Sequence, residues 1–295
     1  VLAFGSFLIQ GLNYGIDFRG GTTIRTESPQ PVDVATYRAA LETLELGDVS
    51  ITEVFDPTFD VDQNVALISI QAQEGQESVT GEVISQVQAA LLVVDPDMVT
   101  PFPSVESVGP TVSGELIKTA AYAVIAAIAA VLFYIWLRFE WQFALGAVAA
   151  LVHDVILTIG IFSQLQIQFD LAIIAALLTI VGYSLNDTVV VFDRVRENLR
   201  RFKKKPLHEV LNLSINETLS RTFMTSVTTL LALIALFVLG GDVIRGFVFA
   251  MIWGVIIGTY SSIFVASAIL LFLGVKRDWS KPDNTEGNQF ANIDA

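Results

Sequence analysis

The sequence predicts a multi-pass α-helical membrane protein that carries an α+β domain outside the bilayer. The first observation is composition: of 295 residues, 53% are hydrophobic and only 16% are charged, whereas a soluble globular chain is about a quarter charged. The second is the distribution of the net charge of −13. Residues 13–115 hold 17 acidic and 3 basic side chains, while the rest of the chain is close to neutral. One acidic, water-soluble segment is therefore attached to an apolar body.

The same composition argues against several classes of function. A nucleic-acid binder needs a surface rich in Lys and Arg, and here acidic residues prevail. The absence of Cys excludes disulfide scaffolds, Cys-ligated zinc and thiol catalysis. No Walker A pattern is present, so the chain does not itself use ATP in the usual way. We expect a protein that is not an enzyme and that uses no cofactor or metal.

Five apolar stretches are long enough to be membrane-spanning helices, because a hydrocarbon core of ~30 Å takes about 20 helical residues. They are residues 116–137, 142–163, 170–192, 221–240 and 246–273. Val1–Leu12 is apolar but shorter; we expect it to be part of an incomplete first span of six, with a cleaved signal peptide as the alternative. The expected domains are residues 1–14 (first span), 15–115 (outer domain), 116–275 (five-helix region) and 276–295 (tail).

Basic residues indicate which ends of the helices face the cytoplasm. Seven lie from Arg194 to Lys205, within a loop expected at about 193–220, and Lys276, Arg277 and Lys281 follow the last span. Short cytoplasmic loops are enriched in Lys and Arg, so six spans place both termini in the cytoplasm and the outer domain on the far side. We expect the bacterial cytoplasmic (inner) membrane, and the basic segment is suited to contact anionic membrane lipid or a cytoplasmic partner.

Within the outer domain, hydrophobic periodicity predicts the order β-α-β-β-α-β. The expected strands are Ile16–Thr26, Ser50–Phe55, Val65–Gln71 and the extended run Met98–Val108, and the expected helices are Val32–Leu44 and Gln76–Leu92. This is the order of a ferredoxin-like domain, an antiparallel sheet with two helices on one face. Its carboxylates are typical of a solvated surface; the alternative is a docking surface for extended polypeptide or another subunit at a sheet edge.

Two glycine motifs connect this domain to the membrane helices. Their candidate residues are Gly15, Asp17, Gly20 and Gly21 after the first span, and Gly109 and Pro110 before the second. Gly and Pro supply backbone angles that other residues disfavour. The motifs are either tight connections or a hinge that lets the outer domain swing over the membrane.

One set of polar residues lies at membrane depth near the cytoplasmic side, where ionisable groups are costly and often functional. Asn186, Asp187 and Thr188 precede Arg194 by about two turns, which puts Asp187 ~10 Å into the core. Arg221 opens the Thr-rich start of the next span. Burial disfavours a charged carboxylate and a nearby guanidinium favours it, so relocation of the arginine would switch proton affinity. The pair is either such a proton carrier or an ion pair that ties two helices together, and Arg221 could also extend to the interface.

A second polar set lies near the middle of the 142–163 span. His153 and Asp154 either relay protons or brace helices through hydrogen bonds. Gly254 and Gly258 in the last span form a Gly-x-x-x-Gly match, a spacing typical of close helix packing and also frequent by chance.

Several motifs in this order resemble the SecD/SecF family of the RND superfamily. The points of match are residues 15–21 (GIDFRGG), 108–113 (VGPTVS), 138–141 (RFEW), 153–154 (HD), 182–198 (GYSLNDTVVVFDRVREN) and 221–226 (RTFMTS). They cover almost the whole chain, and the 17-residue stretch from Gly182 is highly specific.

The resemblance implies six spans, a ferredoxin-like periplasmic domain and an accessory role in Sec protein export driven by the proton-motive force. The family's membrane Asp and Arg linked to proton flow fall on Asp187 and Arg221. Implied partners are a separate SecD, the SecYEG translocon, the translocating preprotein and, further, YajC and YidC. Two alternatives stay open: an RND-type proton-coupled exporter of small molecules or lipids, and a translocon scaffold that moves no protons.

Overall fold

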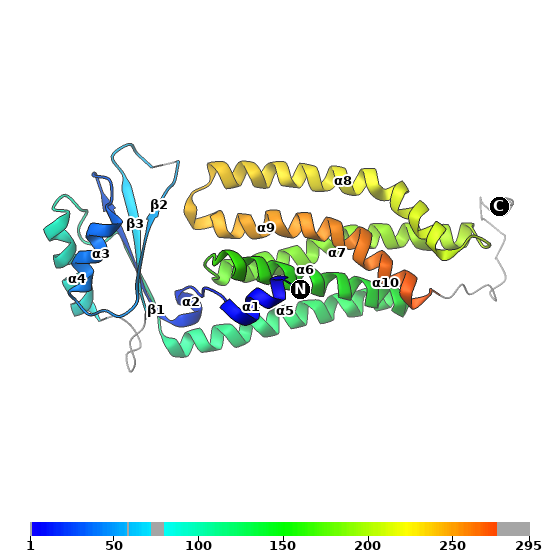
Figure 1. The fold of residues 1–295 in the computed structure, drawn as a ribbon, viewed down its shortest axis with the longest axis horizontal. Helices are drawn as coiled ribbons and strands as arrows, with labels where there is room; N and C mark the ends of the chain where they lie inside the picture. The colour runs from blue at the N-terminus through cyan, green and yellow to red at the C-terminus, as the bar shows by residue number, and fades with distance from the viewer. Residues whose placement is uncertain (1, 58, 72–79, 276–295) are drawn as a thin grey trace.

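The computed structural model describes residues 2–57, 59–71 and 80–275. The molecule is elongated, with a small α+β domain at one end of a bundle of long helices (Figure 1). Five helical segments are long and apolar enough to cross a membrane: α5 (Pro110–Arg138), α6 (Trp141–Leu165), α7 (Leu171–Arg201), α8 (Leu207–Leu239) and the run formed by α9 (Asp242–Tyr260), η1 (Ser261–Val265) and α10 (Ala266–Leu273). All five predicted spans are confirmed as helices of that length; the predicted tail at 276–295 lies outside the described residues.

All five helical segments are longer than predicted, and α7 and α8 exceed the prediction most. α7 continues to Arg201, and the stretch Leu207–Leu219 joins the fourth predicted span in one helix of 33 residues. The segment expected as a basic loop is therefore mostly helical, and only residues 202–206 connect α7 to α8. The amphipathic pattern of Leu207–Leu219 carries the helical period through to the apolar span, because no Gly or Pro interrupts it.

Helix α1 (Leu2–Gln10) has nine residues, too few to cross a membrane by itself. It lies against α6, where the Ser163 hydroxyl donates to the Gly11 carbonyl at 2.6 Å. A sixth span remains a prediction.

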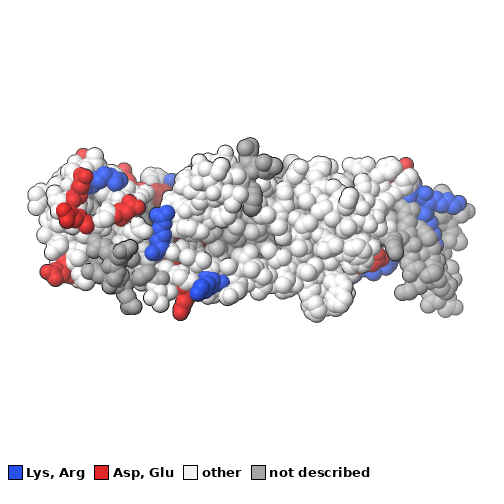
Figure 2. Space-filling view, turned by 60° about the horizontal axis from the view of Figure 1, so that its bottom comes forward, with Lys and Arg blue, Asp and Glu red and all other residues white. Residues whose placement is uncertain are grey.

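Charged side chains gather at the two ends of the molecule. On the face drawn in Figure 2, patches of acidic residues and a few basic ones lie on and beside the outer domain, mainly basic residues lie at the opposite end, and a wide stretch between them carries almost no charge. A surface with so little charge, formed by long apolar helices, is one that a hydrocarbon core accepts.

The outer domain contains a four-stranded antiparallel sheet and two helices. Its elements are β1 (Gly21–Ser28), α3 (Val34–Glu42), β2 (Val49–Val54), β3 (Asn64–Gln71), α4 (Gly81–Val94) and β4 (Ser104–Val108), and the strand order is β2-β3-β1-β4. Helices α3 and α4 lie on the face of the sheet that points away from the membrane helices (Figure 1). Alternate residues of β3, Ala66, Ile68 and Ile70, are fully buried beneath them, as the period-2 pattern requires.

Three predicted boundaries in this domain were wrong. Ile16–Arg19 forms a short helix, α2, rather than the start of a strand, because Gly20 has a φ of 75° and turns the chain before β1 begins. The last strand covers only Ser104–Val108 of the predicted run. Helix α4 begins at Gly81, where the Thr80 hydroxyl accepts from the Val83 amide, rather than at Gln76; residues 76–79 lie outside the described residues.

The Gly-x-x-x-Gly prediction is confirmed as a close packing face. A Cβ added at Gly254 would collide with the side chain of Ile180, and one added at Gly258 would lie 3.1 Å from the Cβ of Ser184. Both neighbours belong to α7, so the two glycines let α9 approach α7 closely.

Candidate functional site

The buried carboxylate of Asp154 joins three membrane helices. It lies on α6 and is 1% exposed. Its Oδ2 accepts hydrogen bonds from the hydroxyls of Ser184 on α7 and Ser261 on η1, both at 2.7 Å. Its Oδ1 lies 3.0 Å from Nδ1 of His153. Two hydroxyls and a ring nitrogen converge on this one carboxyl, so the cluster ties α6, α7 and the α9–α10 run together.

Asp187 lies three residues beyond Ser184 on α7, and therefore on nearly the same helical face. Its side chain is 3% exposed, and Oδ2 has no hydrogen-bond partner among the described residues. Thr188 beside it is also buried and donates back to the Ser184 carbonyl at 3.0 Å, whereas Asn186 is exposed. Asp187 is thus a buried acid with an unsatisfied oxygen, one helical turn from the Asp154 cluster.

Arg221 is the positive charge that acts on Asp187, from the neighbouring helix α8. No ion pair within 4.0 Å joins the two side chains in the described part of the chain, and Arg221 itself is exposed. Thr222, next to it, is 1% exposed and its hydroxyl also has no partner. The structure brings the predicted pair near each other without closing a contact between them.

The first glycine motif is held against the connection between α6 and α7. The Gly15 amide donates to the Phe169 carbonyl at 2.9 Å, and an Asp17 oxygen accepts from the Leu171 amide at 3.1 Å. Asp170 caps the start of α7; burial raises the pKa of its carboxyl, and the nearby charge of Asp17 raises it further. This connection therefore gathers two carboxylates at the N-terminus of α7, where they face its free amides.

The glycines of the two motifs differ in their φ angles, and only some of these angles require glycine. Gly20 and Gly21 have φ values of 75° and 148°, and a Cβ on Gly21 would collide with the Ile70 carbonyl. Gly15 and Gly109 have φ values of −70° and −71°, which any residue adopts, so the expectation of special angles is wrong for these two. Gly109 immediately precedes α5, which begins at Pro110, the first-turn position that proline favours.

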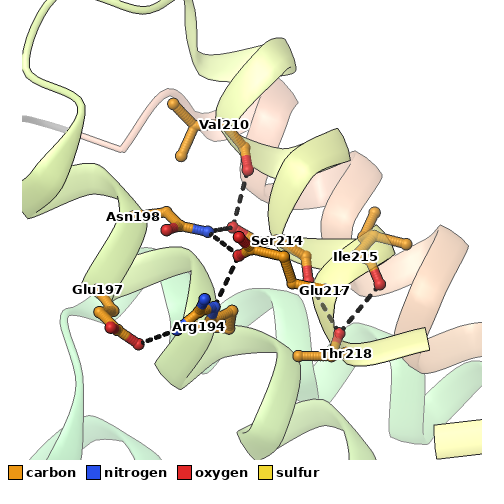
Figure 3. A network of polar contacts seen from close by, with 8 residues as sticks. All are labelled: Arg194, Glu197, Asn198, Val210, Ser214, Ile215, Glu217 and Thr218. Atoms are coloured by element: carbon orange, nitrogen blue, oxygen red, sulfur yellow. Dashed lines mark hydrogen bonds and ion pairs between the residues drawn. The ribbon is translucent and has the colours of Figure 1, made fainter. Parts of the chain in front are cut away.

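A polar network joins α7 and α8 at the basic end of the molecule (Figure 3). Arg194 donates to Glu217 at 2.7 Å and to Glu197 at 2.6 Å. The buried side-chain amide of Asn198 donates to Glu217 at 2.6 Å and to the Ser214 hydroxyl at 3.0 Å. Two of the bases expected to mark topology, Arg194 and Arg196, thus also hold helices: Arg196 donates to the Arg138 carbonyl at 3.3 Å.

Sequence reasoning missed the serines that complete the Asp154 cluster. Ser184 and Ser261 stand in apolar stretches, and serine alone is a weak signal. Ser184 could have been found from its position one turn before Asp187, whereas Ser261 depends on how α9 crosses α6 and α7. Among the described residues, no group of three or more His, Asp or Glu is arranged to hold a metal ion.

Two family models match the chain. Residues 86–276 match the model described as protein export membrane protein SecD/SecF, C-terminal, and residues 5–32 match the SecD/SecF GG motif. The second match contains Gly20 and Gly21, and the first contains Asp154, Asp187 and Arg221.

Named relatives and solved structures agree with these models. The chain is 65% identical to the protein translocase subunit SecF of Cereibacter sphaeroides over 98% of this chain and 89% of that protein, and 42% identical to the protein translocase subunit SecF of Vibrio alginolyticus over 93% and 84%. It superposes on the crystal structure of SecDF, a translocon-associated membrane protein from Thermus, with a TM-score of 0.78 and 38% identity, covering 92% of this chain. A SecDF structure in a super-membrane-facing form gives a TM-score of 0.66 with 39% identity.

This chain spans only 36% of the length of either SecDF chain. With models and full-length relatives in agreement, this chain belongs to the SecD/SecF family of protein-export membrane proteins.

Proposed function

We propose that this protein is an accessory subunit of the Sec protein-export machinery. With SecD, it uses the proton-motive force to promote preprotein translocation across the cytoplasmic membrane. Support comes from relatives named protein translocase subunit SecF that match nearly the whole chain. Its role is in transport rather than in catalysis of a chemical reaction.

The observation that carries the proton role is the environment of Asp187. The Asp187 carboxyl is 3% exposed and one of its oxygens has no hydrogen-bond partner among the described residues. A buried carboxyl that is not held by hydrogen bonds is better suited to binding and releasing a proton than to stabilising the fold. Arg221 acts on it from α8 without closing an ion pair, so a small movement of α8 would change the balance between the charged and neutral acid. Asp154, by contrast, has three polar partners, which favours bracing of the helices over proton relay for His153 and Asp154.

The architecture that we propose has six spans, with α1 as part of the first, and cytoplasmic termini. The outer domain faces the periplasm and is ferredoxin-like, a classification supported by the strand order β2-β3-β1-β4 and by two helices on one face. The domain limits stay as proposed from the sequence: 1–14, 15–115, 116–275 and 276–295. The basic end of the molecule supports this orientation, because Lys and Arg favour the cytoplasmic side.

The partners that we propose are SecD, the SecYEG translocon, the preprotein and, further, YajC and YidC. SecD is supported by the SecDF structures, in which a single chain contains a region like this one and a further 64% of its length beyond it. The helices α5 and α8 also leave much surface for partners: within their most apolar windows only 6% and 11% of residues are buried.

The experiment that tests the proton role is replacement of Asp187 by Asn. In inverted membrane vesicles that contain SecD, we expect proton-dependent stimulation of export to be lost, while ATP-driven export by the translocon continues. Asp193→Asn is the matched control, because Asp193 lies on the same helix but is exposed and pairs with Arg138 at 3.6 Å. Full stimulation with Asp187→Asn would contradict the proton role and leave the scaffold alternative.

A further inference from the structure

Besides its direct continuation from β4 into α5, the outer domain contacts the membrane helices through two segments that are far apart in the sequence. The first is the segment 13–20, which lies in a β-bridge with the connection between α6 and α7. There the rings of Phe18, Phe162 and Phe169 pack together and are 7%, 0% and 5% exposed. Backbone hydrogen bonds and a cluster of buried aromatic rings hold this first contact, which we call the anchor.

The second contact joins the loop after β2 to the connection between α8 and α9. The Phe55 amide donates to Oδ2 of Asp242 at 2.6 Å, and the Asp242 amide donates to the Phe55 carbonyl at 2.9 Å. The residues beside these two are also in close contact, since a Cβ on Gly241 would collide with the carboxylate of Asp56. In Figure 1 the connection between α8 and α9 lies on the upper side of the helix bundle, whereas α2 lies on the lower side near α5.

The two contacts differ in what holds them. The Phe55 side chain is 58% exposed, and no aromatic ring of the described residues packs against it. Solvent-exposed hydrogen bonds without apolar burial are the ones that open most easily. Asp242 also forms an ion pair with Arg245, one turn along α9, so its carboxylate keeps a partner when the Phe55 amide leaves. The second contact therefore lacks the buried aromatic packing that holds the first.

Helix α9 connects this second contact to the buried polar site. It begins at Asp242 and runs for 19 residues, about 28 Å, to Ser261, whose hydroxyl donates to Asp154. Along the way Gly254 and Gly258 hold it against Ile180 and Ser184 of α7. Because α9 is continuous and packs closely on α7, we expect a displacement at its Asp242 end to change the contacts that Ser261 makes at the other end.

We propose that the pair of hydrogen bonds between Phe55 and Asp242 is a releasable latch that couples the position of the outer domain, through α9, to the Asp154–Ser184–Ser261 cluster beside Asp187. The expected effect of the latch on export rests on the proposed function. The latch itself and its coupling to the cluster do not, because all of their residues belong to this chain. When the latch opens, the outer domain turns about its anchor at residues 13–20.

The first experiment locks each contact in turn with a disulfide, in a chain that has no Cys of its own. The latch variant is Asp56→Cys with Gly241→Cys, where the two Cβ atoms would lie 3.2 Å apart. The control is Gly15→Cys with Asp170→Cys at the anchor, where they would lie 3.5 Å apart. Both separations are near the ~3.5–4.5 Å of disulfides. The readout is the ratio of proton-dependent export between the oxidised and reduced forms of the same variant.

We expect oxidation to remove most of the proton-dependent export of the latch variant, with recovery on reduction, and to leave the anchor variant unchanged. Equal export by the fully oxidised and reduced latch variant would overturn a role for latch opening in export. This result differs from a failure of the proposed function, which Asp187→Asn reports in a protein with an unmodified latch.

The second experiment measures the coupling without any export. Ser261→Ala is introduced into the latch variant, and the rate of disulfide formation between residues 56 and 241 is followed in membranes. We expect a severalfold slower rate, because α9 loses its tie to Asp154 and the latch stays open for longer. Ser262→Ala is the matched control, since the Ser262 hydroxyl donates only within its own helix, to the Thr259 carbonyl. Equal rates in the two variants would overturn the coupling.

Discussion

The outer domain and the membrane helices bury different kinds of side chain. In the part of the outer domain that precedes α5, the centre is filled by large aliphatic residues such as Ile24, Leu41, Ile68 and Leu91, and four of the described polar residues are buried. In the membrane helices, sixteen of the described polar residues are buried, most of them Ser and Thr. Water drives apolar residues together, whereas lipid tails are as apolar as leucine and give helices no such drive. The membrane part therefore depends on close packing at small residues and on hydrogen bonds.

The largest loss of stability is expected when a buried aliphatic side chain of the outer domain is shortened. Ile68→Ala removes a fully buried side chain from the centre of the outer domain and should cost about 2–5 kcal/mol of its stability. Leu231→Ala on α8, where the side chain is 64% exposed toward the membrane, should change stability very little. Thermal unfolding of the purified protein in detergent measures both. If the two variants lost similar stability, the exposed Leu231 would have to pack against another molecule.

A smaller effect is expected from disturbing close packing in the membrane. Gly254→Val adds a side chain whose Cβ would already collide with Ile180 of α7, and overpacking of this kind costs about 1–3 kcal/mol. Gly182→Val is the control: it makes the same change within α7, at a position with no neighbouring atom within 4 Å of the added Cβ. The difference in melting temperature between the two variants isolates the contact between α7 and α9, and no difference would contradict it.

The smallest effects compare one hydrogen bond from each region. In the outer domain the Tyr37 hydroxyl donates to the buried Asp95 at 2.6 Å, and Tyr37→Phe should cost about 1–2 kcal/mol because Asp95 is left unsatisfied. In the membrane the hydroxyls of Ser226 and Thr259 lie 2.6 Å apart, and Ser226→Ala should cost only about 0.6 kcal/mol. A larger loss for Ser226→Ala would reverse the comparison.

The tyrosine also predicts a pH dependence. Burial raises the pKa of Tyr37 above its ordinary value, and the hydrogen bond to Asp95 raises it further. Above about pH 10 the unfolded chain releases this proton while the folded domain retains it, so stability falls as pH rises. The parent should lose more stability than Tyr37→Phe between pH 9 and about 11. Chemical unfolding at several pH values measures this, with Tyr122→Phe, an exposed site, as the control.

The sequence was most informative where one physical rule determines the structure. Helix length against membrane thickness located all five long spans, and period-2 alternation predicted the strand Val65–Gln71, in which Ala66, Ile68 and Ile70 are fully buried. Depth in the membrane singled out Asp154 and Asp187, and both are buried. Each of these features depends on local composition alone.

The features that sequence missed depend on tertiary contacts. The segment Ile16–Arg19 was predicted to begin a strand, but it forms helix α2, in which Phe18 packs on the distant Phe169 rather than in the core of its own sheet. Ser261 and the reciprocal bonds of Phe55 and Asp242 likewise depend on how distant segments meet. Their sequence neighbourhoods carry no special pattern.

The π segment Ser261–Val265 determines which face of α10 packs against α6. A π turn accommodates one more residue than an α turn, and one residue in an α-helix corresponds to a rotation of about 100°. Leu270 and Ala266 are fully buried against α6, where Gly146 makes room for them. Deleting one residue between 261 and 265 would regularise the helix and turn this contact away from α6. The irregular turn thus lets one helix satisfy two alignments: a hydroxyl aimed at Asp154 and, beyond it, an apolar face aimed at Gly146.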